Sequence, residues 1–128
     1  MLKSLTLGIA TIAFCLSAAA QTATGTLQGR VIDASGAVVP GAKVTVENQR
    51  TSVKQELTTN AEGVFVQPFL QPSEYRVVVE KEGFEKSITT DVRVNVEQKV
   101  SLELPLKVGN VSTTVEVTAS AAQLLTNA

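Results

Sequence analysis

Apolar and polar residues alternate along most of the chain after residue 25, and Gly, Pro, Asn and Asp interrupt the alternation at short intervals. The stretch GRVIDASGAVVPGAKVTVEN, residues 29–48, shows this pattern, with two alternating runs on either side of a Gly- and Pro-rich turn. Successive side chains of a β-strand point to opposite faces, so a period of two indicates strands with one buried face. No eleven-residue window after the N-terminal segment has a helical period, and we therefore predict an all-β chain.

Seven alternating runs follow one another, with clusters of turn residues between them. We predict strands at residues 26–33, 42–48, 52–60, 64–70, 74–82, 86–96 and 99–108. Short strands at roughly ten-residue spacing are typical of two packed sheets, so we expect a seven-stranded antiparallel β-sandwich. Three aromatic residues, Phe65, Tyr75 and Phe84, should share its core.

The turn between the first two expected strands has the chemistry of a structural connection. Gly36 and Gly41 can adopt positive φ without a Cβ clash, and Pro40 fixes φ and removes a backbone donor. Asp33 can accept hydrogen bonds from the backbone that follows it. The stretch lacks the G-x-x-x-x-G-K-[ST] spacing and the following helix of a phosphate-binding loop, so we interpret it as a strand reversal.

Residues 1–20 are arranged like a secretory signal peptide. Lys3 provides a positive start, and the apolar run Leu5–Leu16 is too short to span a bilayer as a helix. Small residues lead up to Ala20, and we expect cleavage between Ala20 and Gln21. The alternative is an N-terminal membrane anchor.

The composition argues against catalysis. Cys15 is the only cysteine and lies in the expected signal peptide, and the full sequence contains no histidine and no tryptophan. The usual general base, the thiol nucleophile and the commonest zinc ligands would therefore be missing after cleavage. Glu80, Glu82 and Glu85 alternate with lysines, which is typical of a solvated rim rather than of a desolvated catalytic pair. We expect no enzyme activity, no catalytic residues, no metal and no cofactor.

The charge of the chain is nearly balanced. Removing Lys3 with the signal peptide leaves 10 Lys and Arg residues against 12 Asp and Glu residues, a net charge of −2 (10 − 12). No basic run stands out, so nucleic acid is not expected as a partner. No basic amphipathic helix indicates attachment to a membrane surface, and no membrane span is expected in the mature chain.

Four motifs, in order, resemble a known family. They are Gly29-x-Val31-x-Asp33-x-x-Gly36, Pro40-Gly41-Ala42-x-Val44, TNAEGVF at 59–65 and LQPSEYRVVVEKEGF at 70–84. This series is similar to the carboxypeptidase regulatory-like domain, in which Phe65 would be the aromatic plug, and the resemblance covers residues 25–108. Ser73 and Glu74 stand where the family usually has Gly and a variable residue, which affects the type of that turn. The resemblance implies a transthyretin-like sandwich without catalytic residues of its own.

Residues 109–128 follow the expected sandwich as an extended tail. In the resembled architecture, a regulatory-like domain after a signal peptide often heads a TonB-dependent outer-membrane receptor, before its plug and barrel. TTVEVTA, residues 113–119, looks like the recognition segment of such receptors. Its Thr-x-x-Val-Thr-Ala pattern falls on Thr114, Val117, Thr118 and Ala119. A recognition segment should be tethered loosely; the alternative is an eighth edge strand or a linker.

Three functions are compatible with these features. The first is a non-catalytic N-terminal module of a TonB-dependent receptor, located in the periplasm or at the periplasmic face of the outer membrane, with the periplasmic domain of TonB as partner. The second is a free-standing secreted or periplasmic adhesion or carbohydrate-binding sandwich, which would need exposed aromatic rings. Tyr75 is expected to point inward and does not supply one. The third is an accessory domain of an enzyme in another chain. We favour the first.

Overall fold

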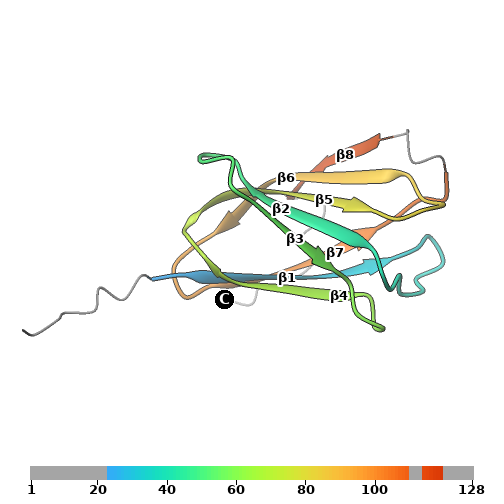
Figure 1. Ribbon diagram of the computed structural model, residues 1–128, viewed down its shortest axis with the longest axis horizontal. Coiled ribbons are helices and arrows are strands. Elements are labelled where there is room, and N and C mark those ends of the chain that lie inside the picture. Colours follow the sequence, from blue (N-terminus) through green and yellow to red (C-terminus); the bar gives the residue numbers. More distant parts are fainter. Residues whose placement is uncertain (1–22, 110–113, 120–128) are drawn as a thin grey trace, which may run out of the picture.

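The computed structural model describes residues 23–109 and 114–119, which form two β-sheets packed face to face (Figure 1). The strands are β1 (Gly25–Ile32), β2 (Lys43–Asn48), β3 (Lys54–Thr58), β4 (Val64–Leu70), β5 (Ser73–Glu80), β6 (Lys86–Val94), β7 (Lys99–Pro105) and β8 (Thr114–Thr118). The first seven confirm the strands predicted from the alternation, and β8 is additional. The predicted signal peptide, with its cleavage site between Ala20 and Gln21, lies outside the described residues.

The two sheets differ in size and in their pairing. One has three strands in the order β4-β1-β7, and the other has five in the order β3-β2-β5-β6-β8. Four pairings are antiparallel, but β1 pairs with β7 and β6 with β8 in parallel. Other strands separate the members of these two pairs, so no tight turn forces them to be antiparallel. The predicted β-sandwich is confirmed, with mixed rather than purely antiparallel pairing.

One apolar core lies between the sheets. Its buried members are Leu27, Val31, Val39, Ala42, Val44, Val46, Phe65, Leu70, Tyr75, Val77, Val79, Val92, Val94, Val100, Leu102, Leu104, Leu106 and Ala119. Phe65 and Tyr75 are each only 3% exposed, whereas Phe84 is partly buried and packs against the cluster. The predicted aromatic core is therefore confirmed for Phe65 and Tyr75, with Phe84 at its margin.

Phe65 packs on a glycine of the neighbouring strand. Gly29 of β1 and Phe65 of β4 are paired residues, and a Cβ added to Gly29 would overlap the phenyl ring. An aromatic ring placed over a glycine covers backbone that has no side chain of its own. Gly29 of the first motif and Phe65 of the third motif therefore form the two sides of one contact.

The turn after β1 has the predicted structure. Gly36 and Gly41 adopt φ of 87° and 70°. The carboxylate Oδ1 of Asp33 accepts hydrogen bonds from the Ser35 amide at 2.8 Å and the Ala37 amide at 3.0 Å. The Ser35 hydroxyl, which donates to the same oxygen at 2.6 Å, is the main cause of the lowered pKa of Asp33, and the backbone amides add to it. The carboxylate thus organises the turn in its ionised form.

Pro105 lies at the end of β7, which forms one edge of the smaller sheet among the described strands. The Leu106 amide donates to the Ile32 carbonyl of β1 at 2.7 Å. Successive amides of an extended strand point to opposite sides, so the nitrogen of Pro105 faces away from β1. Proline has no N–H there, and a foreign strand finds one donor fewer at this edge.

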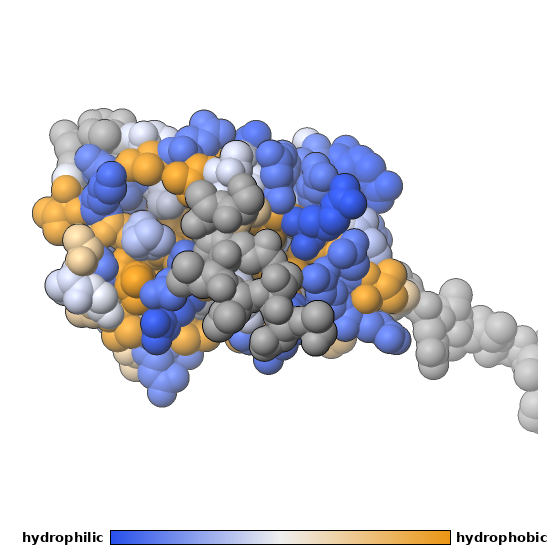
Figure 2. All heavy atoms as spheres, turned by 180° about the vertical axis from the view of Figure 1, so that it is seen from behind, coloured by the Kyte–Doolittle hydropathy of each residue, from blue (hydrophilic) through white to orange (hydrophobic). Residues whose placement is uncertain are grey.

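The surface mixes polar and apolar side chains. Figure 2 shows apolar residues interspersed with polar ones on the coloured part of one face. Phe69, at 81%, and Val108, at 77%, are the most exposed of the large apolar residues described. Among the residues that the structure describes, no helix has the length and apolar character needed to cross a bilayer.

Candidate binding surfaces at one edge and one end of the sandwich

The predicted recognition residues lie on β8 and directly after it. Thr114, Val117 and Thr118 belong to this strand, which forms one edge of the larger sheet and pairs with β6. Ala119 is 7% exposed and Val117 packs against the core, whereas Thr114 and Thr118 are exposed. This part of the tail is therefore an edge strand paired with β6, which is one of the two interpretations that the sequence left open. Residues 111–113 lie outside the described part of the chain.

The packing beneath β8 is incomplete. A cavity of about 190 Å³ lies there, lined by Glu85, Ser87, Thr89, Leu104, Pro105, Lys107, Val115 and Val117. The Thr89 hydroxyl is buried and has no hydrogen-bond partner among the described residues; an unpaired buried polar group costs about 1–3 kcal/mol. Val115 and Val117 are only half-buried. β8 is thus held mainly by backbone pairing rather than by dense side-chain packing.

The two ends of the sandwich differ in which residue types adopt left-handed backbone conformations. At the end with the β1–β2, β3–β4 and β5–β6 connections, glycines adopt them, with φ between 70° and 87°: Gly36, Gly41, Gly63 and Gly83. Toward the opposite end, non-glycine residues adopt them, with φ between 55° and 62°: Ser52, Phe69, Asp91 and Glu97. Each non-glycine residue in this region costs about 1–3 kcal/mol, and such strain often accompanies binding sites. We call residues 49–53, 69–73 and 91–98 the strained-loop end.

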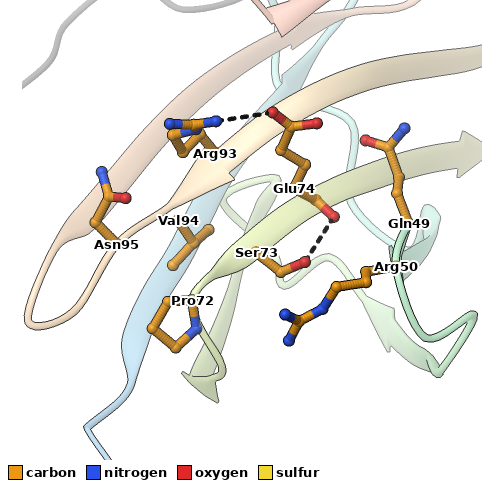
Figure 3. A pocket seen from close by; sticks show the side chains of 8 residues that line it. All are labelled: Gln49, Arg50, Pro72, Ser73, Glu74, Arg93, Val94 and Asn95. Carbon is orange, nitrogen blue, oxygen red and sulfur yellow. Dashed lines mark hydrogen bonds and ion pairs between the residues drawn. The ribbon is translucent and has the colours of Figure 1, made fainter.

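A polar pocket of about 460 Å³ opens at the strained-loop end (Figure 3). Its lining consists of Gln49, Arg50, Pro72, Ser73, Glu74, Arg93, Val94 and Asn95. Arg93 and Glu74 point toward one another, with 3.1 Å between Nη2 and Oε1, and their exposure limits the stability gained from this pair. Arg50 makes no ion pair with a described residue. These groups can hydrogen-bond or pair with a ligand, and the pocket contains no histidine or thiol.

Two buried polar residues hold the connections of this end together. Asn48 Oδ1 accepts hydrogen bonds from the Arg50 amide at 2.9 Å and from the Ser73 hydroxyl at 3.0 Å. The Tyr75 hydroxyl donates to the Gln71 carbonyl at 2.6 Å. Burial raises the pKa of Tyr75, against the opposing effects of the Asn48 side chain and the Arg50 charge. The β2–β3 and β4–β5 connections are thereby fixed to each other and to the core.

Phe69 is an exposed aromatic residue that the sequence analysis did not identify. Strict alternation from buried Phe65 would place Phe69 inward. Between Gln67 and Leu70, however, β4 has one residue more than the paired part of β1. The extra residue reverses the faces, so that Leu70 is buried and Phe69 points outward. Pro68 was the available signal, because proline inside a strand marks an edge or a bulge.

Phe69 borders a second cavity, of about 230 Å³. The residues that line it are Val46, Asn48, Thr51, Val53, Gln55, Phe69, Leu70, Gln71 and Tyr75. The lining combines apolar side chains with neutral amides and hydroxyls and contains no Lys, Arg, Asp or Glu. Its chemistry therefore differs from that of the neighbouring charged pocket.

The acidic residues predicted to form a solvated rim lie at the opposite end. Glu80 pairs with Lys86 at 3.2 Å, with both side chains 36% exposed, and Glu82 is exposed. Within residues 23–109 and 114–119, no group of three or more His, Cys, Asp or Glu side chains is placed to hold a metal ion. This arrangement agrees with a solvated rim.

Comparisons with known proteins identify relatives of this fold. The model of the carboxypeptidase regulatory-like domain matches residues 26–107, and no curated protein matches significantly. The Bacillus anthracis TIE protein is 23% identical, with a TM-score of 0.59 over 67% of this chain and 17% of that one. Hydroxyquinol 1,2-dioxygenase from Pseudomonas putida DLL-E4 is 10% identical, with a TM-score of 0.56 over 68% of this chain and 57% of that one. A candidate carbohydrate-binding protein from Bacteroides uniformis ATCC 8492 is 17% identical, with a TM-score of 0.53 over 63% of this chain and 40% of that one.

The structural likenesses concern the fold alone, since every identity is below 25%. The chain spans less than two thirds of the length of each of these three proteins. The family match is more informative, because it covers most of the chain and the same four motifs that the sequence presents in order. Regulatory-like domains of this kind are in general non-catalytic. The chain belongs to the carboxypeptidase regulatory-like domain family.

Proposed function

We propose that this chain is a non-catalytic interaction module at the head of a TonB-dependent outer-membrane receptor, where it works beside the plug and barrel in nutrient uptake. The observation that carries the proposal is the position of Thr114–Ala119. This segment follows the family domain closely in the sequence, and its strand β8 forms one edge of the larger sheet. A partner can reach such a strand without opening the core.

An edge strand can be captured in two ways. Among the described strands, β8 has a neighbour on one side only, so a strand of the TonB periplasmic domain can add to its other side. Alternatively, β8 can leave β6 and pair with the partner instead. In either case backbone hydrogen bonds provide affinity and alternate side chains provide specificity. The cavity beneath β8 favours the second route, since a segment with few buried contacts opens at little cost.

The proposal places the chain in the periplasm or at the periplasmic face of the outer membrane. It is supported by the order of charge, apolar run and small residues in 1–20. The intact mass of protein recovered from the cell envelope should correspond to a chain that starts at Gln21. A mass that still includes Met1 to Ala20 contradicts cleavage and leaves an uncleaved anchor as the explanation.

Binding to the purified periplasmic domain of TonB, measured by calorimetry and cross-linking, tests the recognition segment. Val117→Pro removes a backbone donor within β8 and should abolish binding. Glu116→Gln, on the exposed face of the same strand, should bind like wild type. Glu56→Pro likewise removes a backbone donor, but from β3 at the opposite edge of the sheet. This variant should retain binding.

The unfolding midpoints of all variants are measured in parallel, so that a loss of binding can be distinguished from a loss of folding. Loss of binding in Val117→Pro alone supports capture of β8. The proposal fails if wild type does not bind TonB, or if Val117→Pro binds as tightly as wild type. Equal losses in Val117→Pro and Glu56→Pro would trace the effect to the sheet as a whole and also contradict a specific role of β8.

A further inference from the structure

We infer that the strained-loop end binds a neutral saccharide, with the ring of Phe69 as its stacking platform. The site lies on the β2–β3 and β4–β5 connections and does not involve β8. The inference is therefore independent of TonB recognition and goes beyond the receptor role.

The backbone conformation and the exposure of Phe69 are both unfavourable. Its φ of 60° is rare for a bulky residue, and its side chain is left 81% exposed to water. Val53, which lines the same cavity, is 57% exposed. Exposed apolar side chains gathered at a strained backbone mark a binding surface. A ligand that covers the ring removes this apolar area from water.

The polar side chains around the ring select the kind of ligand. Thr51, Gln55 and Gln71 are exposed and neutral, and the cavity lining carries no charged residue. A charged ligand would find no counter-charge in this lining, and a purely apolar one would leave amides and hydroxyls without partners. A sugar ring presents an apolar face of C–H groups for the aromatic ring and a rim of hydroxyls for the amides. The lining therefore fits a neutral saccharide.

The backbone on either side of the cavity is fixed by buried groups, which reduces the cost of binding. Leu70, next to the platform residue, is 3% exposed and anchors the end of β4 in the core. The hydrogen bond from Tyr75 to the Gln71 carbonyl, at 2.6 Å, fixes the connection that follows. Asn48 holds the facing β2–β3 connection through its side-chain oxygen. The cavity is thus preformed between two connections that the core keeps in place.

Titration of the full chain with neutral hexasaccharides of glucose, xylose and mannose tests this site, with backbone amide NMR shifts and calorimetry as readouts. At least one saccharide should shift the amides of residues 51–55 and 69–71. Phe69→Ala should weaken its affinity at least tenfold, which corresponds to about 1.4 kcal/mol, and Gln55→Ala should weaken it as well. Val66→Ala, which truncates another exposed apolar residue of β4, should bind like wild type.

Three outcomes overturn the inference. The first is that no saccharide of the panel binds at millimolar concentration. The second is that Phe69→Ala, shown to be folded by an unchanged amide spectrum outside the cavity, binds like wild type. The third is that an apolar peptide, such as a short leucine-rich one, shifts the Phe69 region while all saccharides fail, which would identify a protein-docking surface instead.

Discussion

Phe65 and Phe69 offer a test of the fold, because they lie four residues apart on β4 and differ strongly in burial. Phe65 is 3% exposed and covers Gly29, whereas Phe69 is 81% exposed. The same substitution, Phe to Ala, should therefore have very different costs at the two positions. We predict that Phe65→Ala strongly destabilises the sandwich and that Phe69→Ala leaves its stability nearly unchanged.

The magnitudes follow from the buried area. A buried phenylalanine removes roughly 150–200 Å² from water, and at about 25 cal/mol per Å² this is worth about 4–5 kcal/mol. Measured Phe→Ala costs in cores are about 3–5 kcal/mol, a large share of the ~5–15 kcal/mol that stabilises a small domain. Phe69 buries about a fifth of its surface, so the same conversion gives about 1 kcal/mol or less.

Urea unfolding followed by far-ultraviolet circular dichroism measures both variants against wild type. An expected difference of at least 2 kcal/mol exceeds the uncertainty of linear extrapolation for a domain of this size. The reasoning is refuted if Phe65→Ala costs less than about 1 kcal/mol, or if Phe69→Ala costs as much as Phe65→Ala. The first result would mean that Phe65 is exposed, and the second that Phe69 is as deeply buried as Phe65.

Four further predictions follow from the same contacts. Gly29→Ala should destabilise by about 1–3 kcal/mol, because its Cβ meets the Phe65 ring, and a double-mutant cycle with Phe65→Leu should show coupling. Amide hydrogens of β8 should exchange faster than those of β5, since β8 lies at an edge over a cavity; equal protection would contradict its weak attachment. The raised pKa of Tyr75 means that the unfolded chain loses the phenol proton first; stability should hold below pH ~10 and fall as pH rises further, with phenolate absorbance appearing together with unfolding. The pKa of Asp33 is lowered, so its ionised carboxylate stabilises the folded chain above pH ~4, and this stabilisation is lost on acidification. Asp33→Asn should therefore reduce the acid dependence of the unfolding midpoint.

Much of the fold could be predicted because the relevant information is local. The period of two located seven strands within a few residues, since neighbouring side chains of a strand always point to opposite faces. The turn at Asp33, Gly36 and Gly41 followed from side-chain chemistry and φ preferences that act within a few residues. The burial of Tyr75 followed from the same alternation, and that of Phe65 from the resemblance to the family's aromatic plug.

The binding surfaces could be predicted less completely. The Thr-x-x-Val-Thr-Ala pattern indicated a recognition segment. It did not indicate whether this segment is free or paired, and the structure shows that it pairs with β6 as β8. The strained-loop end was not predicted, because Ser52 and Glu97 are not residue types that favour positive φ, and Asp91, whose type tolerates it, lies inside an alternating run that reads as a regular strand. Ser52 and Glu97 lie in connections between strands, whereas Asp91 lies within β6 where its register with β5 shifts by one residue.

By itself, then, the sequence determined the strand positions, the turn chemistry, the two central core aromatics and the lack of histidine. The tertiary structure alone decided which strands are neighbours, that β1 with β7 and β6 with β8 run in parallel, and that Phe69 faces water. The physical reason is that alternation defines faces only relative to one another. One extra residue in β4 reverses them, and edge partners are chosen by contacts between residues far apart in the chain.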